Sequence, residues 1–257
     1  MILELAHTET GAGAPLVVLH GLFGSARNWA MIARSLGDAH RVLALDLRNH
    51  GNSPWSERMD YPAMAGDVAG FIERHGIGPC PVLGHSMGGK VAMWLALQRP
   101  DLVSAVIPAD VAPVPYDSTL LAYVHAMRAV ELDRYRRRAE VEAALAGTIP
   151  EAGIRSFLMQ NLVAEGGELR WRINLEAIER SFDLITGFPE TDLDYGGPAL
   201  FLDGDRSAYI RPEHEPAIRR LFPRARIETI RDAGHWLHAE QPEQVLRALT
   251  RFLGEIA

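Results

Sequence analysis

The sequence of 257 residues is poor in the residues that build several common kinds of site. It contains one cysteine, Cys80, so it can form no disulfide within the chain and no cysteine-based zinc cluster. Basic residues do not prevail, because 26 Lys and Arg stand against 33 Asp and Glu, for a net charge of -7. This balance gives no general attraction to phosphate backbones or anionic lipids. We therefore expect no nucleic-acid partner.

Long apolar runs are missing as well. No stretch approaches the roughly 20 apolar residues that a membrane helix needs. The first residues, Met1–His7, show neither the basic region nor the apolar core of a signal peptide. These features predict a cytoplasmic protein without a membrane partner. Hydrophobic residues still make up 47% of the chain, which is enough to fill the core of one large domain.

Short apolar runs alternate with helical patterns along most of the chain. The runs expected to form strands are Leu16–His20, Arg41–Asp46, Pro81–Leu83, Ser104–Ala109, Ala199–Leu202 and Arg226–Ile230. The segments with helical spacing are Trp29–Leu36, Met64–Arg74, Lys90–Gln98 and Glu243–Leu253. This alternation predicts an α/β fold with a mostly parallel sheet covered by helices on both faces.

The alternation stops between residues 113 and 195, where we find helical patterns but no convincing strand. The candidate helices are Leu120–Arg128, Arg134–Ala146, Ile154–Leu162 and Asn174–Ile185. The stretch is too long for an ordinary connection. We interpret it as a helical cap, or lid, inserted into a core made of residues 1–112 and 196–257. Acidic residues surround its arginine-rich run, Arg134–Arg138, which we interpret as a solvated helix face.

One motif carries a specific chemical prediction. Residues Gly84–Gly88 read G-x-S-x-G, between an apolar run and a helical pattern. This is the strand–turn–helix context of a nucleophile elbow, with Ser86 at the tip of the turn. The backbone of so tight a turn is strained, so the residues two positions away must lack side chains. The helix that follows then aims its first amides at charge developing beside the serine.

The same segment allows a second interpretation. Residues Gly84–Lys90 also spell G-x-x-x-x-G-K, the beginning of a phosphate-binding loop. That motif continues with Ser or Thr to bind magnesium, whereas this chain has Val91. We therefore favour the nucleophile elbow.

A serine nucleophile needs a base within hydrogen-bond reach. Among the ten histidines, His235 lies in the short loop Asp232–Trp236, after the last predicted strand. Loops at the carboxyl ends of parallel strands are where α/β sheets place their sites. His235 also follows Ser86 in the chain order expected for this fold. We expect His85 to point away from Ser86, and His20 to brace the loop at Gly21.

The third member of a triad is an acid that orients the base. The usual acid follows the penultimate strand, but that position holds Ser207, while Asp203 and Asp205 are out of register. Asp110 stands at the carboxyl end of the preceding strand, and its carboxylate could also reach His235. We choose Asp110 and keep Asp205 and Asp203 as alternatives.

An oxyanion hole completes such a site. One amide comes from the residue after the nucleophile, here Met87, and the other from a loop after an early strand. That loop is His20–Gly24, and we choose Leu22 for the second amide, with Phe23 next. Each donor of this kind contributes roughly 3 kcal/mol to transition-state stabilisation.

Several longer motifs occur in the same order as in a known family. They are His20–Ser25, Asp46–Pro54, Gly84–Lys90, Asp110–Val114, Trp171–Leu175 and Asp232–Gln241. Together they resemble the bacterial esterases related to the mammalian abhydrolase-domain-11 proteins, over nearly the whole chain. The resemblance implies the α/β-hydrolase fold, a serine esterase acting on short-chain or thioester acyl substrates, and no metal or cofactor. It also implies an acid at Asp110. By the same analogy, Phe23, Trp29, Asn49 and Trp236 line the substrate pocket.

The expected function is hydrolysis of small esters, and several alternative functions of the same fold stay open. Within the hydrolases these are thioesterase, lactonase, peptidase and cofactor-free haloperoxidase. A different class is a non-catalytic receptor for a small ligand on the same scaffold, since fold alone does not settle function. We expect a small-molecule ester or thioester as the partner, and a monomer or homodimer as the assembly.

Overall fold

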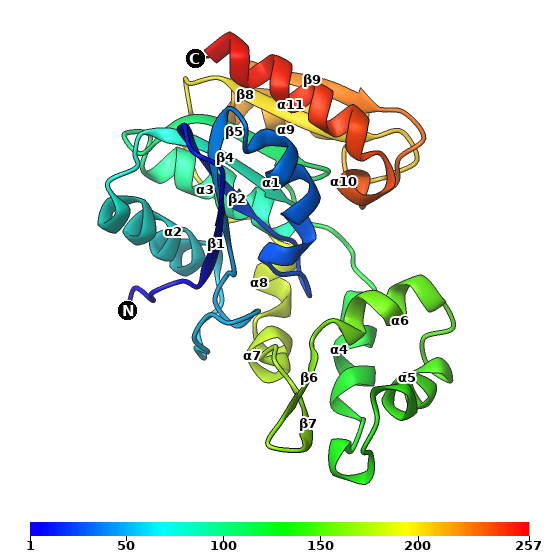
Figure 1. The fold of residues 1–257 in the computed structure, drawn as a ribbon. Coiled ribbons are helices and arrows are strands. Elements are labelled where there is room, and N and C mark those ends of the chain that lie inside the picture. Colours follow the sequence, from blue (N-terminus) through cyan, green and yellow to red (C-terminus); the bar gives the residue numbers. More distant parts are fainter. Residues whose placement is uncertain (257) are drawn as a thin grey trace.

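A computed structural model describes residues 1–256, whose main sheet has seven strands in the order β1-β3-β2-β4-β5-β8-β9 (Figure 1). Strand β1 pairs antiparallel with β3, and all other neighbours are parallel. The strands are β1 (His7–Thr10), β2 (Ala14–Leu19), β3 (His40–Leu45), β4 (Cys80–His85), β5 (Val103–Ala109), β8 (Ala199–Gly204) and β9 (Ala225–Ile230). Each expected strand is present. The sequence did not predict β1, because this edge strand is short, exposed and polar.

Helices cover both faces of the sheet. They are α1 (Ala30–Leu36), α2 (Tyr61–His75), α3 (Met87–Gln98), α9 (Glu215–Leu221), α10 (Leu237–Glu240) and α11 (Pro242–Ile256). The apolar side chains of α1 and α11 pack in one cluster on one face, and those of α2, α3 and α9 pack in a second cluster on the other face. The central strands are buried on both sides, which explains their uninterrupted apolar sequences. The predicted α/β fold is confirmed.

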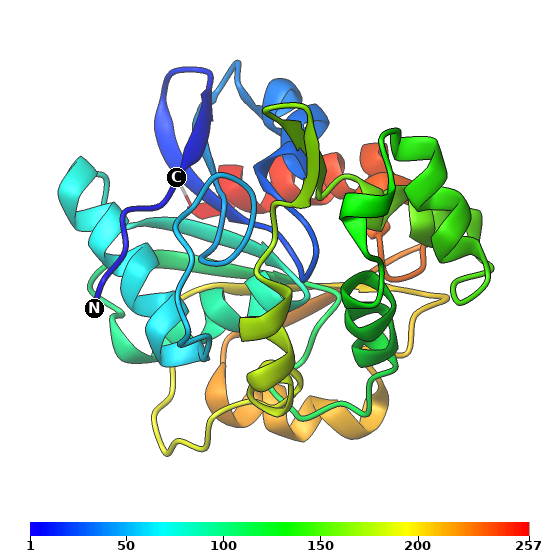
Figure 2. The same ribbon diagram turned by 90° about the horizontal axis from the view of Figure 1, so that it is seen from below.

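The chain between β5 and β8 forms a separate group of elements, which we call the cap. Its helices are α4 (Leu120–Arg128), α5 (Arg138–Ala146), α6 (Ala152–Met159), α7 (Leu175–Arg180) and α8 (Phe182–Thr186). Short 3-10 turns are η1 (Ala26–Trp29) in the core, η2 (Leu132–Arg134) in the cap and η3 (Pro212–His214) after β8. Figures 1 and 2 show the cap helices gathered on one side of the sheet. Their buried side chains join the apolar cluster of α2 and α3.

The prediction that residues 113–195 contain no strand is wrong. Strands β6 (Leu162–Glu165) and β7 (Glu168–Trp171) form an antiparallel hairpin in the cap. Gly166 and Gly167 connect them with positive φ angles of 61° and 85°. Two residues with positive φ give the turn that matches the twist of a hairpin. The adjacent glycines between two short apolar stretches were therefore the signal for these strands.

No helix among residues 1–256 combines the length and the apolar character that crossing a membrane requires.

Candidate active site

Ser86 occupies the turn between β4 and α3, as the motif predicts. Its φ and ψ angles are 51° and -117°, a backbone conformation that a residue with a side chain rarely adopts. A Cβ atom on Gly84 would lie 2.1 Å from the Gly88 carbonyl oxygen, and one on Gly88 would lie 2.5 Å from the His20 carbonyl oxygen. Both glycines are therefore required by the close approach of β2, β4 and α3. The tight turn presents Ser86 at the end of the sheet.

His235, in the loop after β9, and Asp110, directly after β5, meet at the same edge of the sheet, on either side of β8. The Nδ1 atom of His235 lies 2.7 Å from Oδ2 of Asp110, whose side chain is completely buried. Because a carboxylate only accepts, Nδ1 carries the proton of the neutral ring and donates it. Strand β5, which ends just before Asp110, pairs directly with β8, so this carboxylate lies beside the segment that follows β8. The contact fixes the tautomer in which Nε2 is free to accept a proton.

Two further donors hold the Asp110 carboxylate. The Gly204 amide donates to Oδ1 at 3.1 Å, and the Ser207 hydroxyl donates to Oδ2 at 2.5 Å. Ser207 stands where the usual acid of this fold is expected, so the serine now supports the acid that comes from β5. These bonds orient the carboxylate toward His235.

The alternative acids lie elsewhere. Asp203 accepts a hydrogen bond from the Thr229 hydroxyl, and Asp205 accepts one from the Ala233 amide. Burial and the nearby charge of Asp110 raise the pKa of Asp203 to about 6. Among residues 1–256, neither carboxylate makes a hydrogen bond or ion pair with His235. The geometry therefore favours Asp110 over both.

Two side chains support the His235 ring and its backbone. The Tyr209 ring stacks on the imidazole, with centroids 3.9 Å apart and planes 18° apart. The Nε2 atom of His85 donates to the His235 carbonyl oxygen at 2.7 Å. Burial, together with the neighbouring histidines, lowers the pKa of His85 well below its usual value, so the ring stays neutral at pH 7. His85 thus positions the loop of the base, a role that the sequence did not indicate.

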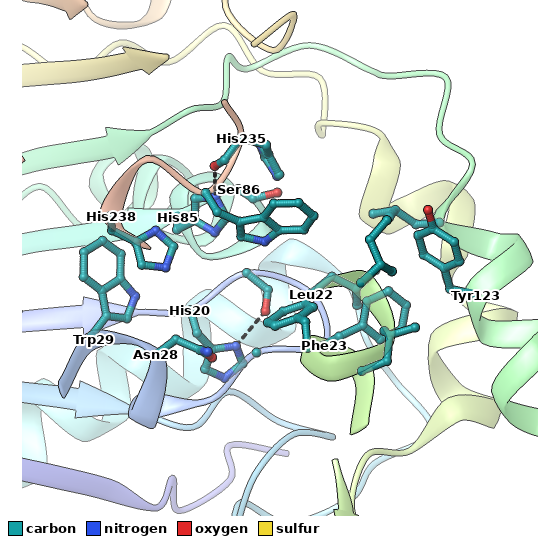
Figure 3. Close-up of a pocket in the computed structure, with 17 residues that line it drawn as sticks. His20, Leu22, Phe23, Asn28, Trp29, His85, Ser86, Tyr123, His235 and His238 are labelled. Carbon is teal, nitrogen blue, oxygen red and sulfur yellow. Dashed lines mark hydrogen bonds between the residues drawn. The ribbon is translucent and has the colours of Figure 1, made fainter. Parts of the chain in front are cut away.

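Ser86, His85 and His235 lie together on one wall of a pocket, with Tyr123 of the cap across from them (Figure 3). No hydrogen bond joins the Ser86 hydroxyl to the His235 ring within the described residues. Such contacts often tighten only when substrate is bound. The structure therefore brings Ser86 and His235, the predicted nucleophile and base, into one cavity, with the His235–Asp110 pair already formed.

The loop His20–Gly24 is held by two buried histidines. His20 donates from Nδ1 to the Gly21 carbonyl at 2.8 Å and accepts at Nε2 from the Leu47 amide at 2.9 Å. His50 accepts from the Phe23 amide at 3.3 Å, so the Phe23 amide is occupied. The Leu22 amide donates no hydrogen bond within residues 1–256. Met87 is the first residue of α3, where an amide has no partner in the helix. These observations favour Leu22 and Met87 as the oxyanion donors.

We call the cavity of Figure 3 the first chamber. It encloses about 550 Å³, its open mouth included. Core residues that line it are His20, Gly21, Leu22, Phe23, Gly24, Asn28, Trp29, His85, Ser86, His235, Trp236 and His238, and cap residues are Leu120, Tyr123, Ile154, Phe157 and Leu158. Phe23, Trp29 and Trp236 line this cavity, and their contact with substrate stays a prediction. Trp29 also stacks on His238, with ring centroids 4.5 Å apart.

A second cavity adjoins Ser86, and we call it the second chamber. It encloses about 380 Å³ and is lined by Leu22, Tyr61, Ser86, Met87, Lys90, Val111, Tyr116, Ser118, Leu120, Ile185, Thr186 and Tyr209. Three of these residues, Leu22, Ser86 and Leu120, also line the first chamber. Ser86 therefore lies at the boundary of two adjoining spaces.

Asn49 differs from its expected place in the pocket. It lines neither chamber and is completely buried. Its side-chain oxygen accepts from the Ser56 amide at 2.7 Å and from Asn174 Nδ2 at 3.1 Å. Asn174 belongs to the cap, so Asn49 joins the core to the cap instead of contacting substrate in these cavities.

The contacts of Lys90 do not favour the phosphate-loop interpretation of Gly84–Lys90. The Lys90 ammonium group donates to three backbone carbonyls in the cap connections, so it is not directed at a bound phosphate. Among residues 1–256, no group of three or more His, Cys, Asp or Glu side chains is arranged to hold a metal ion.

Comparisons with known proteins agree with this geometry. The model of the alpha/beta hydrolase family matches residues 16–248. The sn-1-specific diacylglycerol lipase ABHD11 of Mus musculus is 44% identical over 246 residues, which cover 93% of this chain and 80% of that protein. Esterase YbfF of Escherichia coli strain K12 is 35% identical and covers 94% of both chains. The solved structure of a marine microorganism esterase superposes with a TM-score of 0.95, at 39% identity, over 97% of this chain and 99% of that one.

The similarity runs along the whole core and through the cap, and it includes proteins named esterase and lipase. The protein is a carboxylic ester hydrolase. The chain belongs to the alpha/beta hydrolase family, as its motifs indicate.

Proposed function

We propose that the protein hydrolyses small carboxylic esters through an acyl-enzyme on Ser86. The observation that carries this proposal is the buried 2.7 Å contact between Asp110 and His235 beside the strained turn of Ser86. A base held in one tautomer, a nucleophile in the same cavity and two available amides are the parts that acyl transfer needs.

The reaction proceeds in two halves. His235 Nε2 takes the hydroxyl proton as Ser86 Oγ attacks the acyl carbonyl, and the Leu22 and Met87 amides donate to the oxyanion. His235 then gives that proton to the departing alcohol, and the C–O bond of the ester breaks. Water then loses a proton to His235 and attacks the acyl carbon. The bond between that carbon and Ser86 Oγ breaks, Oγ takes the proton from His235, and the acid leaves.

We assign the two halves of the substrate to the two chambers. His235 must deliver its proton to the leaving oxygen, and His235 lines the first chamber but not the second. The alcohol part of the ester therefore lies in the first chamber. The acyl part then extends into the second chamber, between Met87, Val111 and Ile185. These apolar side chains suit the acyl groups of short to medium length that we propose as substrates.

Thioesters of the same acyl groups fit this geometry, because the acyl carbonyl and its chain are unchanged. The mouse relative is named for a diacylglycerol, an ester with a bulky alcohol part. The first chamber, lined by residues of both core and cap, is the space for such a leaving group.

The test is hydrolysis of p-nitrophenyl acetate, butyrate and octanoate by the wild type and by Ser86→Ala. We expect turnover by the wild type, a preference for the shorter chains, and loss of turnover in the variant. Activity that survives the substitution would contradict the nucleophile assignment. An absence of wild-type turnover on all three esters would instead point to a specialised substrate or to the non-catalytic receptor.

A further inference from the structure

Lys90 is the only lysine in the chain, and it is buried. It lies in the first turn of α3, four residues after Ser86, and only 2% of its surface is exposed. No carboxylate lies within ion-pair distance of its ammonium group among residues 1–256. A buried cation without an opposite charge is costly unless its protons are hydrogen-bonded.

All three N–H groups of Lys90 find backbone acceptors. Nζ lies 2.8 Å from the Val114 carbonyl, 2.8 Å from the Thr186 carbonyl and 2.6 Å from the Gly187 carbonyl. Val114 belongs to the connection that leads from β5 into the cap, and Gly187 begins the connection that leads back from α8. A single side chain on the helix of the nucleophile therefore joins both connections of the cap.

The return connection offers these carbonyls for a structural reason. The last carbonyls of a helix have no partner within it, and α8 ends at Thr186. A cation is favourable at that end because the helix dipole is negative there. Thr186 also accepts from the Tyr116 amide at 3.1 Å, so the two connections are bonded to each other as well as to Lys90.

Two tyrosines enclose the ammonium group and bind the same region. The Lys90 Nζ atom lies 4.6 Å from the Tyr116 ring centroid and 5.9 Å from that of Tyr61, within range of cation–π attraction. The Tyr61 hydroxyl donates to the Ile185 carbonyl, and the Tyr116 hydroxyl donates to the Tyr209 carbonyl, each at 2.5 Å. Lys90, Tyr61 and Tyr116 all line the second chamber. Their hydrogen bonds fix its wall.

Burial opposes the charge at this position. It lowers the pKa of Lys90 to about 7, while the three carbonyl acceptors favour the protonated form. An apolar side chain of the same length would fill the space without burying a charge. It would remove the hydrogen bonds to all three carbonyls and leave Thr186 only its bond from the Tyr116 amide, so the connections would lose the contact that sets their distance from α3.

We propose that Lys90 is a positioning and specificity-determining residue: by joining both connections of the cap to the helix that begins after Ser86, it fixes the shape of the second chamber and so selects the length of the acyl group. Lys90 does not touch the reacting atoms. This inference rests on the proposed function, because it assigns the acyl group to the second chamber.

The experiment compares two series of esters. In the acyl series the leaving group is p-nitrophenol and the acyl group grows from acetate through butyrate and hexanoate to octanoate. In the alcohol series the acyl group is butyrate and the alcohol grows from methanol through butanol to octanol, with acid release as the signal. The variants are Lys90→Met, which matches the side chain in length, and Lys90→Arg, which keeps the charge and the donors. Phe157→Ala, in the first chamber, is the matched control.

In the wild type, KM should change with acyl length, because specificity for chain length comes from pocket shape. In Lys90→Met, we expect the ratio of KM between octanoate and acetate to be about tenfold closer to one. The dependence of KM on alcohol length in this variant should follow the wild type within about twofold. Lys90→Arg should recover most of the acyl dependence. Phe157→Ala should change the alcohol series and leave the acyl series as in the wild type.

A different pattern would overturn the proposal. A role confined to stability would lower kcat for every ester by one common factor, through loss of active protein, and leave both KM series unchanged. If Lys90→Met does not fold, Lys90→Gln replaces it, and a wild-type acyl series in that variant contradicts the proposal. Failure of the proposed function is recognised separately, as wild-type inactivity or as turnover in Ser86→Ala, and the Lys90 proposal then falls with it.

Discussion

The Ser207 hydroxyl donates a 2.5 Å hydrogen bond to Oδ2 of Asp110, the same carboxylate oxygen that His235 contacts at 2.7 Å. The proposed acid thus lies at the end of β5, and the position after β8 contributes a donor that holds its carboxylate. Chain segments 97 residues apart cooperate to orient one imidazole.

The first prediction removes this donor. Ser207→Ala should lower kcat about tenfold, because a hydrogen bond to a charged group contributes about 1.5 kcal/mol. Ser207→Thr keeps the hydroxyl and should retain most of the activity. Ser104→Ala, at an exposed position of β5, is the control for a surface serine. Equal kcat values for Ser207→Ala and the wild type would show that the bond has no role in orienting Asp110.

The second prediction moves the acid. Asp110→Asn should lower kcat by about 10⁴-fold, since the amide favours the wrong tautomer of His235. Ser207→Asp added to Asp110→Asn puts a carboxylate beside the same ring and should restore at least about tenfold. Steady-state kinetics on p-nitrophenyl butyrate measures both. Near wild-type activity in Asp110→Asn would return the role of the acid to Asp203 or Asp205.

The third prediction concerns the tight turn at the nucleophile. Gly88→Ala should destabilise the protein by at least about 2 kcal/mol, because the added Cβ would meet backbone atoms of β2 that cannot move aside. Gly147→Ala adds the same atom where nothing lies within 4 Å, at a φ of -69°, and should be neutral or slightly stabilising. Urea denaturation compares the two variants. Similar stabilities would contradict the packing described around the elbow.

The fourth prediction is a loss of stability in acid. Burial lowers the pKa of His20 and of His238 to about 4 and that of His50 to about 3, and that of His85 lies well below its usual value. The unfolded chain therefore binds more protons than the folded protein as the pH falls from about 6.5 toward 4. Stability must decrease over that range, by at most about 1.4 kcal/mol per pH unit for each histidine.

Guanidinium denaturation between pH 7 and pH 4.5 measures this slope. His238→Phe removes one of these histidines and should reduce the slope by the contribution of that one ring. If the unfolding free energy of the wild type changes with pH by no more than one histidine can contribute, these rings become protonated in the folded protein, which contradicts the prediction.

The sequence predicted the core of the fold and the parts of the site that depend on local patterns. Ser86 follows from its glycines, and Asp110 and His235 follow from their places after predicted strands. The exposed strand β1 lacked an apolar pattern, and the hairpin of β6 and β7 was missed although its paired glycines were visible.

Relationships between distant segments could not be predicted in the same way. Lysine is a residue type usually found at the surface of a helix. Nothing near Lys90 in the sequence shows that its partners are carbonyls 24, 96 and 97 residues away. Asn49 was expected in the pocket because its motif suggested it, but its contact with Asn174 places it between core and cap. Backbone acceptors leave no trace in residue identity, since every residue carries a carbonyl.

The central claim is a covalent acyl intermediate on Ser86, and intact-protein mass spectrometry tests it most directly. The wild type and His235→Ala are mixed with p-nitrophenyl butyrate, stopped in acid within the first turnovers and weighed, with Ser86→Ala as the control. We predict one butyryl adduct per chain, located by peptide mapping on Ser86 in the wild type and absent from Ser86→Ala. An adduct on another residue would contradict the account. So would turnover without any adduct under conditions in which hydrolysis of the acyl-enzyme is the slow step.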